Sequence, residues 1–326
     1  MYKNIYIPVD NSDYSNYAIN IGVSIADKMG AQATGSHVYS AKLHDKRFKD
    51  MEEGLPEPYQ AQKKLERSRK VHESLIGDGL RLISNAYLDV FDKKCEEKGV
   101  TSTRKLLEGK NWFEIVKDIR ESHYSLVVLG VRGLGTVNGN SFVGSVCERV
   151  IRNVDTDVLV VKDDKILTDR IVVAVDGSRQ SVAALEKAIE LGKLFGTEVE
   201  AVSVFDPHYH AVAFKSLVGV LSKEAGEKFK FKEQAQLHDE VIDKGLKKVY
   251  ESYLDEAAQL GINKGMHVKT RILAGKPYHE ICKYLEEKPA SLLVLSRFGA
   301  HQAEETEMGS TSENLLRYAQ CNMLLT

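Results

Sequence analysis

Residues 5–10, with the sequence IYIPVD, recur as IVVAVD at residues 171–176. Each copy is a short, mostly apolar run that ends in aspartate. Continuous apolar runs of this length are typical of buried strands in parallel sheets, whose two faces are both covered by helices. The two copies therefore predict the same central strand in two α/β domains.

The repeat extends over almost the whole chain at a constant offset of 166 residues. Three pairs illustrate it: Asp10/Asp176, Val38/Val204 and Gly133/Gly299. Beyond the last pair the offset is 165, as in Gly144/Gly309 and Ser145/Ser310. A period this long indicates a duplicated domain rather than a solenoid. We expect two domains, at residues 1–165 and 166–326.

The composition is that of an ordinary soluble globular protein. Of the 326 residues, 43% are hydrophobic and 28% are charged, and the net charge is −2. Without a basic excess, neither nucleic acid nor an anionic membrane is an expected partner. Apolar runs are too short to span a bilayer, and no secretory segment is evident at the start. The four cysteines lack metal-type spacing, which predicts reduced thiols in a cytoplasmic protein.

Strand and helix patterns alternate in each half. The expected strands are 5–9, 33–39, 101–107, 126–129 and 158–161, with copies at 171–175, 199–205, 267–273, 292–295 and 323–325. Ser12 or Asp13 is suited to cap the first helix, and Ser178 its copy. A long charged section follows the second strand of each half and predicts an inserted helical segment. Such alternation favours a parallel sheet with ligands at the carboxyl ends of the strands, where the strand order reverses.

A glycine-rich loop follows the fourth strand of the first half. Residues 130–145 read GVRGLGTVNGNSFVGS, and the glycines are Gly130, Gly133, Gly135, Gly139 and Gly144. We expect them to let the backbone approach a ligand and to adopt positive φ. A helix expected to start at Ser145 would add free N–H groups and a helix dipole suited to phosphate. The alternative is an ordinary flexible loop. Neither a Walker A loop nor a dinucleotide fingerprint fits the spacing.

These motifs resemble the universal stress protein family. The resemblance rests on VDNSDYS at 9–15, VDGSRQS at 175–181 and a loop of the form G-2x-G-9x-G-[ST], and it covers nearly all of both halves. It implies two tandem Rossmann-like domains, each a five-stranded parallel sheet of order 3-2-1-4-5 with helices on both faces. Some members of the family bind ATP and others do not.

The resemblance also implies roles for individual residues. Asp10 would lie on the ribose or phosphate side and Val38 in the adenine pocket. The phosphate group would be held by Gly130, Gly133, Gly144 and Ser145. The loop departs from the family pattern, since ten residues rather than nine separate Gly133 from Gly144.

The second half has equivalents of these residues but differs in its loop. The equivalents are Asp176, Val204, Gly299, Gly309 and Ser310. Ser296 replaces the first glycine, and the loop carries Glu304, Glu305 and Glu307. Carboxylates beside a polyphosphate are repulsive unless they are screened or bridged by a metal ion. We therefore expect the first half to hold the better site; the alternative is that these glutamates point into solvent.

The expected function is a stress-response regulatory protein that binds ATP or another adenine nucleotide, with Mg²⁺ as a candidate companion ion. We find no nucleophile–base constellation in the sequence, so hydrolysis is expected to be slow or absent. One alternative is an interaction scaffold without nucleotide. In the family, the final strands of two domains commonly pair, which here would join the two halves or two copies of the chain.

Four histidines recur at matching positions: His44/His210 and His72/His238. Neutral imidazoles are ligands for zinc and other transition metals, so these residues are candidates for a metal or small-molecule sensor. Two ligands fall short of the usual three or four. The alternative is that they pack helices.

Overall fold

The computed structural model describes the chain except for residues 55, 57–61, 136–142, 208–242 and 301–307. The described residues form two compact units, Met1–Ile166 and Leu167–Thr326, which we call domain 1 and domain 2.

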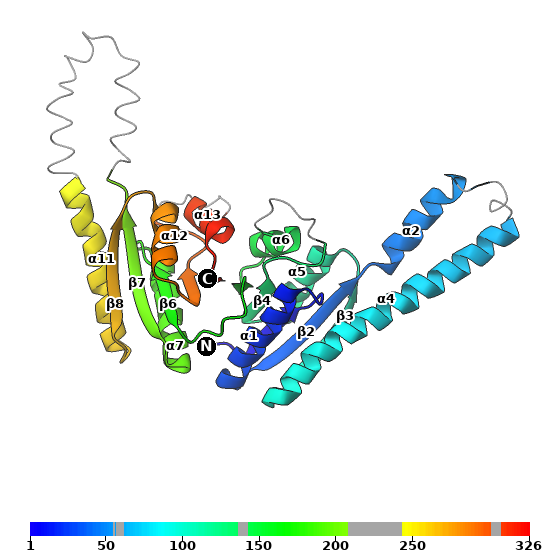
Figure 1. Ribbon diagram of the computed structural model, residues 1–326, viewed down its shortest axis with the longest axis horizontal. Coiled ribbons are helices and arrows are strands. Elements are labelled where there is room, and N and C mark those ends of the chain that lie inside the picture. Colours follow the sequence, from blue (N-terminus) through cyan, green and yellow to red (C-terminus); the bar gives the residue numbers. More distant parts are fainter. Residues whose placement is uncertain (55, 57–61, 136–142, 208–242, 301–307) are drawn as a thin grey trace, which may run out of the picture. The chain divides into compact units, whose positions relative to one another are not determined.

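Domain 1 contains a sheet of five parallel strands. These are β1 (Asn4–Pro8), β2 (Gln32–Tyr39), β3 (Ser102–Glu108), β4 (Leu126–Gly130) and β5 (Asp157–Val161). Since β1 pairs with both β2 and β4, while β3 pairs with β2 and β5 with β4, the order is β3-β2-β1-β4-β5. Its described α-helices are α1 (Asp13–Met29), α2 (Ala41–Met51), α4 (Gln62–Lys98), α5 (Asn111–Ser122) and α6 (Ser145–Asn153) (Figure 1).

Domain 2 repeats this arrangement. Its strands are β6 (Arg170–Ala174), β7 (Glu198–Phe205), β8 (Val268–Ala274), β9 (Leu292–Leu295) and β10 (Asn322–Leu325). They pair in parallel in the order β8-β7-β6-β9-β10. The described helices are α7 (Arg179–Phe195), α11 (Asp243–Asn263), α12 (Pro277–Glu287) and α13 (Ser310–Tyr318). The predicted α/β class, with parallel strands and helices, is confirmed in both domains.

The first helix of each domain begins as its sequence predicts. The Ser12 side chain caps α1 by accepting from the N–H of Ser15, and Ser178 caps α7 in the same way. Each helix ends at a glycine in the left-handed conformation, Gly30 or Gly196. This residue terminates the helix at little steric cost. Both helices thus begin a few residues after β1 and β6, close to Asp10 and Asp176.

The inserted segment of domain 1 is a helical arm. Its helix α2, the short 3₁₀ turn Glu52–Gly54 and the long helix α4 follow β2. The C-terminal half of α4 buries Ser84, Leu88, Phe91 and Cys95. Phe91 lies so close to β2 that a Cβ on Gly35 would lie 2.4 Å from its ring. The N-terminal half of α4 extends beyond the sheet beside α2 (Figure 1).

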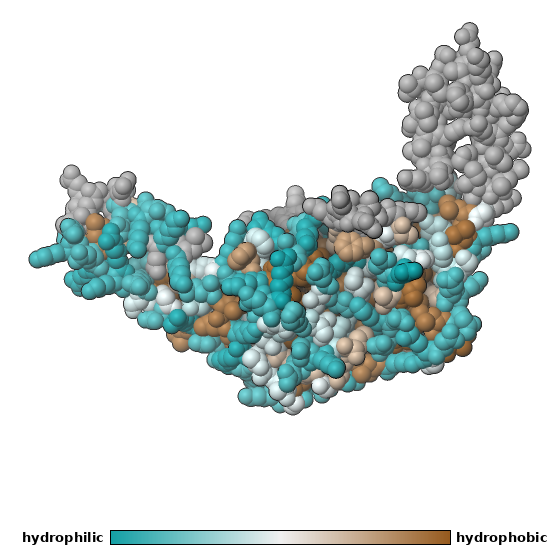
Figure 2. Space-filling view, turned by 180° about the vertical axis from the view of Figure 1, so that it is seen from behind, coloured by the Kyte–Doolittle hydropathy of each residue, from teal (hydrophilic) through white to brown (hydrophobic). Residues whose placement is uncertain are grey.

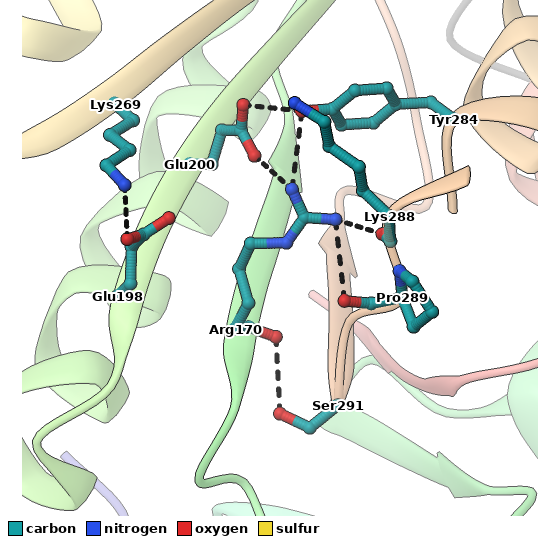
Figure 3. A network of polar contacts seen from close by, with 8 residues as sticks. All are labelled: Arg170, Glu198, Glu200, Lys269, Tyr284, Lys288, Pro289 and Ser291. Carbon is teal, nitrogen blue, oxygen red and sulfur yellow. Dashed lines mark hydrogen bonds and ion pairs between the residues drawn. The ribbon is translucent and has the colours of Figure 1, made fainter. Parts of the chain in front are cut away.

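A buried ion pair connects α12 to the sheet of domain 2 (Figure 3). Arg170 Nη1 on β6 donates to Glu200 Oε2 on β7 at 2.5 Å, and the Tyr284 hydroxyl on α12 donates to Glu200 Oε1 at 2.6 Å. Arg170 Nη2 also donates to the Lys288 carbonyl directly after α12. Burial first, and then the bond to Glu200, raise the pKa of Tyr284.

Domain 1 makes the corresponding connection with different residues. Asn4 and Thr34 occupy the positions of Arg170 and Glu200. Instead, Lys105 Nζ on β3 donates to Asp118 Oδ1 on α5 at 2.6 Å. The two copies of the fold have therefore acquired different ion pairs for one structural task.

The surface visible in Figure 2 is largely hydrophilic, with hydrophobic residues singly or in small groups. Within the described parts of the chain, no helix combines the length and apolar character needed to cross a membrane.

Candidate functional site

Domain 1 has a cavity of about 560 Å³ at the carboxyl ends of its central strands. It lies where β1 separates β2 from β4, so the strand order reverses there. All six residues predicted for this domain line it: Asp10, Val38, Gly130, Gly133, Gly144 and Ser145. Val38 is 7% exposed and contributes an apolar wall.

Asp10 anchors the glycine-rich loop. Its Oδ1 accepts from the N–H and the hydroxyl of Ser12, at 3.0 and 2.7 Å. Its Oδ2 accepts from the Leu134 N–H at 3.0 Å. Both carboxylate oxygens therefore have partners within the chain. Asp176 repeats these bonds with Ser178 and with the Ala300 N–H, at 2.9 Å in the latter case.

The expectation of positive φ is wrong for the loop glycines that the structure describes, since none of them has positive φ. Gly139 lies outside the described residues. Three of the others instead permit close approach. A Cβ would lie 2.8 Å from the Tyr14 backbone at Gly130, 2.2 Å from Asp10 Oδ2 at Gly133, and 3.1 Å from the Val131 carbonyl oxygen at Gly144. The absence of side chains therefore allows β4 to approach α1 at Tyr14 and allows the loop to approach Asp10, which follows β1.

The N-terminus of α6 faces this cavity. Gly144 is its N-cap and offers no side chain to the first-turn N–H groups. Ser145, Val146 and Cys147 of that turn line the cavity, as does Arg132. A Cβ on Gly144 would lie 3.2 Å from Arg132 Cα, so the arginine emerges next to the helix start. A helix N-terminus and a guanidinium group together favour an anion.

Cys147 is not suited to nucleophilic chemistry. It is buried, and burial raises the pKa of its thiol to about 12. A thiol with so high a pKa carries almost no thiolate near neutral pH. Cys147 therefore contributes to the cavity as part of its wall.

His37 lines the cavity as a neutral imidazole of defined tautomer. The Ser84 hydroxyl donates to the Leu80 carbonyl at 2.6 Å, so it accepts from His37 Nδ1–H at 2.8 Å. The other nitrogen, Nε2, then carries a lone pair and accepts hydrogen bonds. Burial lowers the pKa of His37 below its ordinary 6.5, and the Asp10 carboxylate opposes that shift.

This pKa shift predicts a pH dependence of stability. Because the folded pKa is lower than the unfolded one, the unfolded chain binds more protons as the pH falls below about 6.5. The stability that neutral His37 contributes is present above that pH and is lost as the pH falls through the folded pKa. His37→Gln should therefore lose less melting temperature than the wild type between about pH 7 and pH 5. If the melting temperatures of His37→Gln and the wild type fell equally over this pH range, the prediction would be contradicted. His267→Gln, which changes an exposed histidine, is the control.

Domain 2 has an equivalent cavity of about 570 Å³. Its lining includes all five predicted equivalents: Asp176, Val204, Gly299, Gly309 and Ser310. Burial tends to raise the pKa of Asp176, but the hydrogen bonds from Ser178, Ala300 and Ser181 outweigh it and leave the pKa below its ordinary value. The two cavities have nearly the same volume, so volume alone does not distinguish the two domains.

The chemistry of the two linings differs. Phe298 occupies the position of Arg132, and the described residues that line the domain 2 cavity include no lysine or arginine. Tyr250, at the position of Ser84, lines the cavity, and Ser203 replaces His37 and donates to the Val175 carbonyl at 2.8 Å. Glu304, Glu305 and Glu307 lie outside the described residues.

Arg132, His37 and Tyr250 were not identified by sequence reasoning. Motif searches look for glycines and aspartates, whereas these residues differ between the halves. A position-by-position comparison at the 166-residue offset pairs Arg132 with Phe298 and would have revealed the difference in charge.

The duplicated histidines do not line either cavity where they are described. His44 is exposed on α2, and His72 on α4 stacks on Phe48 with ring centroids 4.3 Å apart. This contact corresponds to the packing interpretation. His210 and His238 lie outside the described residues. Among the residues that are described, no group of three or more His, Cys, Asp or Glu side chains is placed to hold a metal ion.

Comparisons with known proteins identify both halves. A model of the universal stress protein family matches residues 1–162 and again residues 168–326. A universal stress protein of Methanocaldococcus jannaschii is 26% identical over 166 residues, which cover 51% of this chain and 86% of the relative. One of Bacillus subtilis is 29% identical over 157 residues, which cover 48% and 97%.

A solved structure matches the chain over both halves. The crystal structure of a universal stress protein from Archaeoglobus fulgidus aligns with a TM-score of 0.58 and 18% identity, covering 99% of this chain and 97% of that one. At this identity the match concerns the fold.

Proposed function

The chain belongs to the universal stress protein family, with one family domain in each half, and on this basis we propose that domain 1 binds an adenine nucleotide in the cavity between β1 and β4. The nucleotide serves as a regulatory ligand. Its hydrolysis is slow or absent.

One observation carries this proposal: the Arg132 side chain and the N-terminus of α6 lie next to each other in the wall of the cavity. Arg132 lines the cavity beside Gly144, at the N-terminus of α6. Backbone N–H groups, a helix dipole and a guanidinium group favour phosphate oxygens. The phosphates are assigned to this wall, and Gly130, Gly133 and Ser145 belong to it.

The opposite side of the cavity suits a base. Val38 supplies an apolar surface there, and His37 Nε2 is a hydrogen-bond acceptor that matches an exocyclic amino group. Asp10 acts by positioning the loop, since both of its oxygens already accept hydrogen bonds from the chain.

Domain 2 is assigned a weaker nucleotide site. Phe298 in place of Arg132 removes the cation, and Tyr250 brings an aromatic ring to the cavity wall. Charge-assisted hydrogen bonds to phosphate are about twice as strong as neutral ones. The loss of one is therefore enough to separate the affinities of the two halves.

Nucleotide binding is expected to stabilise domain 1 against heat. ATP with Mg²⁺ at about 100 times its dissociation constant should stabilise the native state by about 2.7 kcal/mol. Arg132→Gln should raise the dissociation constant by roughly tenfold or more, because it removes a charged contact. Differential scanning calorimetry with and without ATP measures both effects. Phe298→Gln is the matched control at the same position of domain 2.

The outcomes separate this proposal from its alternatives. An unchanged melting temperature at millimolar ATP would favour an interaction scaffold without nucleotide. If the ATP-induced rise in melting temperature were lost in Phe298→Gln but retained in Arg132→Gln, the nucleotide would be assigned to domain 2. Pairing of the final strands within one chain, as the family resemblance implies, remains a prediction.

A further inference from the structure

Helix α4 carries a stripe of apolar and small residues along one side, and all of them except the half-buried Gly79 are exposed. The stripe consists of Val71, Leu75, Gly79, Leu82, Ala86 and Val90. Leu75 and Leu82 are 68% and 73% exposed, unusually high values for leucine in a folded domain. Val71 and Val90 are 50% and 45% exposed. The residues of α4 that pack on domain 1, such as Leu88 and Phe91, lie on another face.

Only the C-terminal half of the stripe is particular to domain 1, because Leu237, Val241 and Gly245 keep an apolar or small residue at the positions of Val71, Leu75 and Gly79. On α11, the equivalent helix of domain 2, Lys248, Ser252 and Glu256 occupy the positions of Leu82, Ala86 and Val90. A polar surface is thus compatible with the same helix on the same kind of sheet. The apolar character of Leu82, Ala86 and Val90 calls for an explanation outside the packing of domain 1.

The spacing of the stripe suits contact with another helix. Successive members are separated by 4, 4, 3, 4 and 4 residues. A repeat of 4, 4 and 3 residues is the 11-residue repeat that keeps an apolar seam in register in a right-handed helix pair. From Val71 to Val90 the seam is about 28 Å long.

The stripe is complementary to itself when two copies run antiparallel. Its spacing reads the same in both directions about the midpoint between Leu80 and Arg81. A two-fold axis there brings Leu75 of one copy to the level of Ala86 of the other. It brings Leu82 to the level of Gly79, where a Cβ would meet nothing within 4 Å in its own chain. Each leucine therefore faces a small residue, which favours close helix packing, while Val71 and Val90 face each other at the ends of the stripe.

The charges at the two ends of the stripe fit the same arrangement. The two-fold axis brings Lys64 of one copy to the level of Glu97 of the other, and Ser68 to the level of Lys93. Opposite charges then meet at both ends. In a parallel pair, Lys64 would meet its own copy and Glu97 its own, which is repulsive. Charge and shape select the same orientation.

We propose that two copies of this chain associate through an antiparallel pairing of their α4 helices, with the stripe from Val71 to Val90 as the contact. The contact is isologous, because one patch meets itself about a two-fold axis. It is separate from the nucleotide site and does not depend on the proposed function.

The mass of the full chain in solution tests the proposal. Analytical ultracentrifugation over about 1–100 μM should show wild type at twice 36.4 kDa. Leu75→Lys/Leu82→Lys should raise the dissociation constant at least 30-fold, the effect of losing one interface hot spot. Because Leu75 and Leu82 are exposed, these substitutions should leave the fold of each copy intact. Val249→Lys, an apolar-to-lysine change at an exposed site on α11, should leave the dimer intact.

Single cysteines test the orientation. In an antiparallel pair, Val71 of one copy lies at the level of Val90 of the other. Val71→Cys mixed with Val90→Cys should therefore form an intermolecular disulfide, and neither variant should do so alone. A monomeric wild type, a doubly lysine-substituted variant that stays dimeric, or a disulfide in Val71→Cys alone would each overturn the proposal.

Discussion

Arg170→Ala should destabilise domain 2 by about 3–5 kcal/mol, the usual result of removing one partner of a buried ion pair. The side chains of Arg170 and Glu200 are only 13% and 7% exposed. Without the guanidinium group, the Glu200 carboxylate would stay buried with the Tyr284 hydroxyl as its remaining partner in this network. The carbonyl of Lys288 after α12 would lose its donor as well.

Domain 1 supplies a matched control for this prediction. Arg170→Asn/Glu200→Thr introduces the residues that domain 1 has at the same positions and leaves no buried charge unpaired. The double variant should therefore be more stable than Arg170→Asn alone. If the two variants unfold at the same temperature, the ion pair is not what makes Arg170 important.

The measurement can be assigned to one domain. Trp112 on α5 is the chain's one tryptophan, so its fluorescence reports on domain 1, whereas circular dichroism reports on both. Arg170→Ala should lower the midpoint of part of the dichroism signal and leave the fluorescence transition in place. A fluorescence transition that moves by the same amount would contradict the assignment of the effect to domain 2.

Gly144→Val is expected to abolish the stabilisation of domain 1 by ATP. The first atom of the new side chain would lie 3.1 Å from the Val131 carbonyl oxygen and 3.2 Å from Arg132 Cα. Both are backbone atoms, which yield less readily than a flexible side chain. The α6 N-terminus and Arg132 would be displaced together, so both contributors to anion binding change at once.

Gly299→Val provides the control, because it alters the weaker site of domain 2 and should retain the ATP-induced shift in melting temperature. If Gly144→Val does not fold, Gly144→Ala makes a smaller intrusion at the same place. If both Gly144→Ala and Gly144→Val retained the full ATP-induced shift in melting temperature, this wall of the cavity would be excluded as the phosphate site.

Much of the fold follows from local patterns in the sequence. The fourth strand was expected at residues 126–129, and β4 is Leu126–Gly130, because its uninterrupted apolar run is buried on both faces. Ser12 was one of two candidates for the α1 cap, and the structure selects it. Ser145 begins α6 as expected, and its equivalent Ser310 begins α13.

The detailed contacts of the site did not follow from sequence. The loop glycines indicated positive φ, but in the structure they allow the backbone to pass close to Tyr14 and Asp10. The positions of these two residues depend on the tertiary fold. The family resemblance implied that Asp10 lies on the ribose or phosphate side of a ligand, which stays a prediction, and the hydrogen bonds that its two oxygens accept from the chain became visible only in the structure. The Arg170–Glu200 pair joins residues 30 positions apart on neighbouring strands, and local patterns carry no information about such pairs.

The four cysteines differ in burial, so we expect thiol reagents to modify one of them before the others. Cys95, Cys147 and Cys321 are buried, whereas Cys282 on α12 is only half-buried. Burial raises the pKa of Cys95, as of Cys147, to about 12, which withholds the reactive thiolate. A fluorophore or spin label therefore attaches first at Cys282, next to the Ile281 wall of the domain 2 cavity. The native chain thus already contains a reporter position for whatever enters its second domain.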